Sequence, residues 1–169
     1  MDAGLLLTRT TALVAFVAYA LALGLWMSSS RRGCRLLWTI GCAVFLLHVA
    51  CAFHFVHRWS HADALAVTAK QTAAVTGIDW GGGLYFNYFF SVLWLGDAAW
   101  WWLAQKNYEL RSSLLAWSIH VFMAFMMFNA TVVFGHGAAR WTGAGAWALL
   151  ALRWLWSRKS RSISLKART

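Results

Sequence analysis

Residues 11–27, TALVAFVAYALALGLWM, form an apolar run without a charged side chain. Extended back to Leu5, the run is long enough as a helix, at about 1.5 Å per residue, to cross a hydrocarbon core of about 30 Å. It ends at residues 28–32, SSSRR, so positive charge follows the apolar residues, whereas a cleaved signal peptide carries it in front of them. The run is therefore predicted to be an uncleaved transmembrane helix.

The composition extends this interpretation to the whole chain. Of its 169 residues, 61% are hydrophobic and 12% are charged, against about 25% charged in ordinary soluble domains. Five acidic and 15 basic residues cannot cover the surface of a water-soluble domain of this length. Thirteen tryptophans suit the headgroup region of a bilayer. We predict one integral membrane domain over residues 1–169, in a multi-pass membrane protein.

Further apolar runs give the predicted fold, an all-α polytopic transmembrane helix bundle of about five spans. The spans cover residues 5–27, 36–57, 84–103, 113–134 and 141–156. The last run is short and contains Arg153, so a helix lying in the membrane interface is the alternative, and it would move the tail to the other side. An extracytoplasmic loop, 58–83, separates the second and third spans, and a basic tail, 157–169, ends the chain.

The loop contains an alanine-rich stretch without helix breakers, which predicts a helix. Ser60 is placed to cap a separate helix, with Asp63 at its third position. Alternatively, the second span continues past the membrane to about Thr76. In both cases Gly77 ends the helix.

Basic residues predict the orientation, because Lys and Arg near span ends are retained in the cytoplasm. With the N-terminus outside and the C-terminus cytoplasmic, the outer side holds only Arg9, Arg58, Lys70 and Arg140. The cytoplasmic side then holds Arg31, Arg32, Arg35, Lys106, Arg111, Arg158, Lys159, Arg161, Lys166 and Arg168. The basic tail favours an anionic cytoplasmic leaflet as partner, at about 1 kcal/mol per base. A nucleic-acid partner is not expected, because no recognition helix or RNP-like strand is present.

Histidines are the polar residues most suggestive of chemistry in so apolar a chain. His54, His57 and His61 share one helical face if the helix continues through Trp59. The predicted topology brings His136 to the same membrane surface. Because imidazole is a common ligand of zinc, copper and haem iron, these four residues are a candidate metal site. The other interpretation is that they are interfacial polar residues without a ligand.

Two deeper histidines and a carboxylate complete the candidates. His48 and His120 lie on parallel spans and are candidate ligands of a single haem. Asp97 lies about as deep as His120, and a hydrogen bond or ion pair between them would lower the cost of a carboxylate in the membrane. Such a pair serves either a structural role or proton handling.

Three functions from different classes follow. The first is a redox or metal-dependent membrane protein that uses the outer histidines. The second is a non-catalytic subunit that packs against larger membrane proteins or a second copy of itself. The third is a proton-coupled carrier that uses Asp97 and His120. A nucleotide-binding loop and a Gly-x-Ser-x-Gly elbow are both missing from the sequence, so nothing in it indicates nucleotide or serine-hydrolase chemistry.

Overall fold

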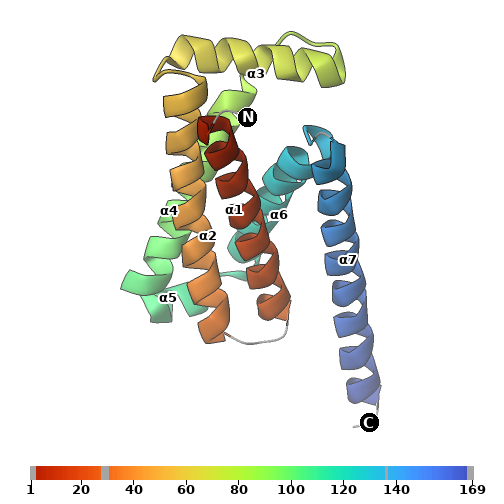
Figure 1. Ribbon diagram of the computed structural model, residues 1–169. Helices are drawn as coiled ribbons and strands as arrows, with labels where there is room; N and C mark the ends of the chain where they lie inside the picture. The colour runs from red at the N-terminus through yellow and green to blue at the C-terminus, as the bar shows by residue number, and fades with distance from the viewer. Residues whose placement is uncertain (1–2, 28–30, 136, 167–169) are drawn as a thin grey trace.

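The computed structural model describes residues 3–27, 31–135 and 137–166, and these residues form helices without any strand (Figure 1). Two of the helical segments, η1 and η2, are single π-helical turns that end longer helices. In chain order the elements are α1 (Ala3–Met27), α2 (Arg31–Cys51), η1 (Ala52–Val56), α3 (His61–Thr76), α4 (Gly83–Leu103), α5 (Gln105–Glu109), α6 (Ser113–Phe128), η2 (Asn129–Val133) and α7 (Gly137–Lys166).

Five long helices run up and down side by side, and α3 lies across one end of them (Figure 1). We call this the α3 end, and the opposite end, where α5 lies, the α5 end. Helix α2 packs against α1 and α4, α6 packs against α4, and α7 packs against α1 and η2. This up-and-down arrangement is the one expected when short connections join antiparallel neighbours.

Three of the described helices are long and apolar enough to span a membrane. They cover Ala3–Met27, Gly33–Val56 and Ser113–Val133, which match three of the predicted spans. The all-helical class of the described residues and the presence of helices able to span a membrane are therefore as predicted. The other two predicted spans, 84–103 and 141–156, form α4 and part of α7. Both helices are long, but neither is among the three described helices that are apolar enough to span a membrane.

An aromatic core joins the helices near the middle of the bundle. Tyr19 of α1, Trp38 of α2 and Trp94 of α4 are fully buried, with ring centroids 5.4 to 6.0 Å apart. Helices α2 and α4 approach closely at Gly41, where a Cβ atom would lie 2.9 Å from Cζ2 of Trp94. Rings of this size bury much apolar area and lock the relative positions of the helices.

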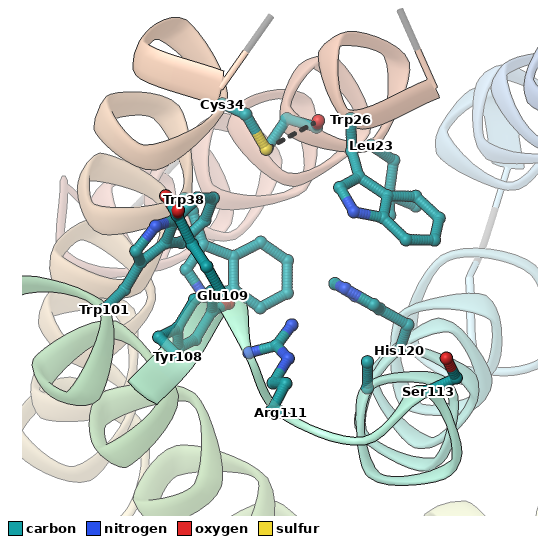
Figure 2. Close-up of a pocket in the computed structure, with 12 residues that line it drawn as sticks. Leu23, Trp26, Cys34, Trp38, Trp101, Tyr108, Glu109, Arg111, Ser113 and His120 are labelled. Atoms are coloured by element: carbon teal, nitrogen blue, oxygen red, sulfur yellow. Dashed lines mark hydrogen bonds between the residues drawn. The ribbon is translucent and has the colours of Figure 1, made fainter. Parts of the chain in front are cut away.

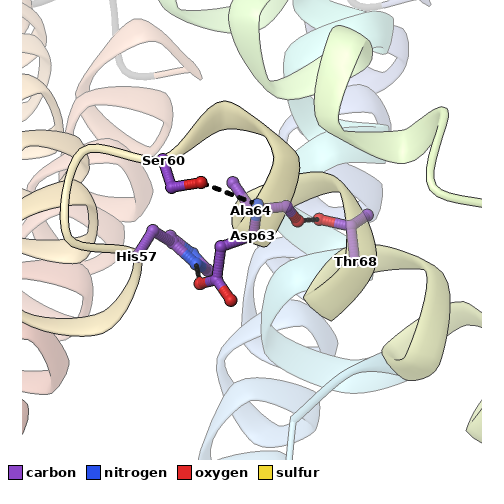
Figure 3. Close-up of polar contacts among 5 residues, drawn as sticks. All are labelled: His57, Ser60, Asp63, Ala64 and Thr68. Carbon is purple, nitrogen blue, oxygen red and sulfur yellow. Dashed lines mark hydrogen bonds and ion pairs between the residues drawn. The ribbon is translucent and has the colours of Figure 1, made fainter.

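The loop between the second and third spans contains the separate helix α3, not a continuation of α2. Helix α2 ends through η1, and Arg58 and Trp59 then adopt positive φ angles of 50° and 59°. A helix cannot continue through residues in this left-handed region. The Ser60 side chain accepts a hydrogen bond from the Asp63 backbone N–H (Figure 3). Gly77 ends α3 at a φ of 77°. Both predicted helix signals are confirmed.

Candidate functional site

The histidines expected to form a metal site at the α3 end each contact a different residue. His57 Nδ1 lies 3.1 Å from Oδ2 of Asp63, as Figure 3 shows. His54 Nδ1 accepts a hydrogen bond from Nε1 of Trp59, and His61 Nδ1 lies 2.9 Å from the Tyr88 hydroxyl. The three imidazoles would share one helical face only if helix α2 continued through Trp59. That condition is not met, because Arg58 and Trp59 adopt positive φ angles and the separate helix α3 follows them.

The described residues contain no group of three or more His, Cys, Asp or Glu side chains placed to hold a metal ion. His136, the fourth ligand expected from the sequence, lies outside the described residues. The predicted metal site therefore lacks support from the part of the chain that the structure describes.

His48 and His120, the candidate ligands of a single haem, each contact a different part of the bundle. The His48 Nδ1 atom lies 2.9 Å from the Thr8 carbonyl oxygen, and this contact joins α2 to α1. His120 packs edge-on against Trp38, with ring centroids 5.5 Å apart. Neither contact involves the other histidine, so the shared haem stays a prediction that these contacts do not support.

Asp97 pairs with the connection between α4 and α6, and not with His120 as expected. Its Oδ1 accepts a hydrogen bond from Nη1 of Arg111 at 3.0 Å, and its Oδ2 accepts one from the Tyr108 hydroxyl at 2.9 Å. The side chains are almost fully buried, at 1% exposure for Asp97 and 8% for Arg111. The cost of burying a carboxylate is thus offset by a charged and a neutral donor.

Tyr108 lies at the centre of a stack at the α5 end. The Trp101 ring is parallel to the Tyr108 ring within 11°, at 4.6 Å between centroids, and Cζ of Arg111 lies 3.7 Å from the Tyr108 centroid. Burial and the nearby Asp97 charge both raise the pKa of the Tyr108 hydroxyl. The hydroxyl therefore stays protonated and keeps donating to Asp97. The stack fixes the Arg111 guanidinium beside the bundle interior.

A pocket of about 390 Å³ opens next to this stack, between α1, α2, α4, α6 and the connection that includes α5. Figure 2 shows Trp26, Trp38, Trp101 and Tyr108 around it, with Arg111 and His120 pointing inward. Its volume lies in the range of small-molecule sites, about 300–1,000 Å³, and pockets between the helices of bundles are common ligand sites. The walls combine flat aromatic surface with a few polar groups.

His120 and Trp38 both line the pocket with buried nitrogens that have no hydrogen-bond partner among the described residues, and His120 has two of them. It is 9% exposed, and in the described structure neither ring nitrogen has a hydrogen-bond partner. Its ring packs 4.7 Å from that of Trp26 and edge-on to Trp38. A neutral imidazole carries one donor and one acceptor nitrogen, and leaving such a buried group unpaired costs about 1–3 kcal/mol. A hydrogen-bonding ligand in the pocket would remove this cost.

Sequence reasoning singled out Asp97 and His120 but missed the residues beside them. Arg111 was counted only as a cytoplasmic charge, and Trp26, Trp38, Trp101 and Tyr108 were not considered as site residues. The available signal was the short polar connection 104–112, which follows a carboxylate-bearing span and carries both a tyrosine and an arginine.

Comparison of the chain with protein-family models, with curated proteins and with solved structures finds no match. Its function is therefore inferred from the geometry of this pocket.

Proposed function

We propose that the chain is a five-span integral membrane protein that binds a small amphipathic molecule in the pocket at its α5 end, on the cytoplasmic side. The single observation that carries the proposal is His120, a buried side chain with two unpaired nitrogens that lines a pocket of about 390 Å³. Buried polar groups without partners are rare and call for an explanation. A bound ligand is the explanation that also accounts for the pocket.

The arrangement of α4 and α7 supports five spans. Both run beside the three apolar helices (Figure 1), and both carry large apolar side chains on their exposed faces. On α4 these include Phe86, Phe89, Val92 and Leu95, and on α7 they include Leu149, Leu152 and Leu155. Contiguous exposed apolar surface of this kind suits lipid better than water.

The basic residues support the proposed orientation. Arg35, Lys106 and Arg111 lie at the α5 end, on α2, on α5 and just before α6. Arg9, Arg58 and Lys70 lie toward the α3 end, on α1, after η1 and on α3. The retention of positive charge in the cytoplasm thus favours the α5 end inside and the α3 end outside.

The geometry favours ligand binding over the proton-coupled carrier. A proton-coupled carrier needs an exchange of protons between Asp97 and His120. The Asp97 carboxylate, however, is held by Tyr108 and Arg111. The second hypothesis, a packing subunit, needs no pocket and predicts that nothing small is retained. It is the alternative that the following experiment separates from the proposal.

The test is to fill the pocket and measure what the protein retains. Ala116 lines the pocket from α6, whereas Leu114, on the same helix, is 79% exposed. Wild type, Ala116→Trp and Leu114→Trp are purified in mild detergent, and their organic extracts are quantified by mass spectrometry. We expect about one small molecule per chain in wild type and in Leu114→Trp, and a large loss in Ala116→Trp.

A matched unfolding measurement in detergent shows whether each variant is folded. Retention of the same molecules by all three folded proteins would contradict the proposal. A wild-type extract that contains only membrane lipids, in the same ratios as in the membrane itself, would contradict it as well. The second result would leave the packing subunit as the better account.

A further inference from the structure

Resting on the proposed function, we infer that the ligand is an uncharged planar ring that carries carbonyl oxygens, of the quinone class, with one carbonyl hydrogen-bonded to His120. The ligand is bound without any electron transfer. The charge, the wall shape and the hydrogen-bonding groups of the pocket all favour such a ligand.

Charge argues against an anionic ligand. Among the lining side chains that the structure describes, Arg111 is the cation, and its charge is balanced by Asp97 at 3.0 Å. Glu109 is a carboxylate of the same lining, and it accepts a hydrogen bond from Gln105. A phosphate or carboxylate would meet no excess of positive charge among these described side chains, and desolvating it there would be costly.

The Arg111 guanidinium and its stack on Tyr108 argue against a cationic ligand. An organic cation binds over the open face of an aromatic ring. Tyr108 offers no open face, because Trp101 is stacked on it and Arg111 lies over it. A second cation would also be placed beside the Arg111 guanidinium. An uncharged ligand fits the pocket better than either ion.

The walls suit a flat molecule. Trp26, Trp38 and Trp101 face the pocket from three different helices, with Ala22 and Leu23 beside them. Aromatic rings bind other rings by offset stacking and edge-to-face contact. A planar ring can therefore lie among the indoles, and an apolar tail can continue along the bundle into lipid.

The hydrogen-bonding groups match ring carbonyls. In one tautomer of a neutral His120, the nitrogen that faces the ligand donates to a carbonyl oxygen, and in the other tautomer the same nitrogen accepts from the hydroxyl that replaces this oxygen in the reduced ring. Arg111 has five N–H groups and donates from Nη1 to Asp97. As its guanidinium points toward the pocket in Figure 2, a second ring oxygen could accept from it.

The experiment titrates purified full-length protein with decylubiquinone and, separately, with dihexanoyl phosphatidylglycerol. Quenching of the pocket tryptophans reports quinone binding, and protection against thermal unfolding reports either ligand. The variants are His120→Phe, which keeps an aromatic ring without nitrogens, and His54→Phe, the same change at an exposed histidine of the α3 end.

We expect saturable quinone binding in wild type and in His54→Phe, and a dissociation constant raised about tenfold in His120→Phe, because an uncharged hydrogen bond is lost. His120→Gln, which keeps one donor and one acceptor, should restore binding. If His120→Phe fails to fold, Ala116→Trp takes its place, with loss of the saturable quenching as the expected result.

Two results would overturn the inference. One is the absence of saturable quinone quenching in wild type. The other is quinone binding that His120→Phe, His120→Gln and Ala116→Trp all leave unchanged. Saturable phosphatidylglycerol binding lost in His120→Phe, without quinone binding, would reject the quinone and keep the ligand-binding function. If wild type retains no molecule at all and binds neither probe, both the quinone inference and the proposed function fail.

Discussion

Arg111 and Asp97 form a buried ion pair between residues 14 positions apart in the chain, with Nη1 of Arg111 3.0 Å from Oδ1 of Asp97. Asp97 lies on α4, and Arg111 lies just before α6. The pair therefore ties the connection between these helices to the bundle interior. It also holds the Arg111 side chain at the pocket edge, where Tyr108 supports it.

Breaking this ion pair on one side should destabilise the fold strongly. Arg111→Met leaves the Asp97 carboxylate buried without its cation, and Asp97→Asn leaves the Arg111 guanidinium buried without its anion. We expect each single change to lower the free energy of unfolding by about 3–5 kcal/mol, and the double variant to lose less than the sum. Denaturant unfolding in mixed micelles measures all four proteins. Additive losses, or losses near zero, would argue against a coupled pair.

Gly41 should not tolerate a side chain, because α2 and α4 touch there. A Cβ atom at this position would lie 2.9 Å from Trp94, so Gly41→Val should cost about 1–3 kcal/mol through overpacking. Gly96 of α4 is the control, since a Cβ there has no neighbour within 4 Å. Gly96→Ala should be neutral or stabilising by up to about 1 kcal/mol. Equal effects of the two changes on thermal unfolding would refute the close contact.

Ser60 should stabilise α3 locally. Its hydroxyl accepts from the Asp63 N–H at 3.1 Å, and the loss of such a cap in Ser60→Ala costs about 1 kcal/mol. Amide hydrogen exchange should speed up in the first turn of α3 and stay the same in α1. Ser118→Ala, at an exposed position of α6, is the control. Unchanged exchange at residues 61–64 would show that α3 begins without this cap.

Reporter fusions test the five-span topology. Alkaline phosphatase inserted after Gly77 should be active, because the α3 end is proposed to face the outside. Green fluorescent protein fused to the C-terminus should be fluorescent, because the tail is proposed to be cytoplasmic. If α7 lies on the membrane without crossing it, the C-terminal fusion reverses, with phosphatase active there and fluorescence lost.

The helices could be read from the sequence because each long one contains an apolar run, and α3 because Ser60 and Gly77 carry local start and stop signals. The arrangement of the histidines could not be predicted from the sequence. It depended on whether the helix continued through Trp59, and the left-handed turn at Arg58 and Trp59 contains no glycine or proline that would indicate it. The partner of Asp97 was missed for a similar reason. Hydrophobic periodicity describes spans, whereas Arg111 and Tyr108 reach Asp97 through a short polar connection that folds back.

The most direct test of the ligand-bearing pocket is nitrogen NMR of protein labelled with ¹⁵N at its six histidine imidazoles. Spectra are compared between protein stripped of ligand by detergent and protein reloaded with a membrane lipid extract, and the His120 signals are assigned from their loss in His120→Phe. We predict that both His120 nitrogens shift on reloading, while those of His54 and His57 stay in place. Unchanged His120 signals, or equal shifts in all the histidines, would contradict a ligand bound at this residue.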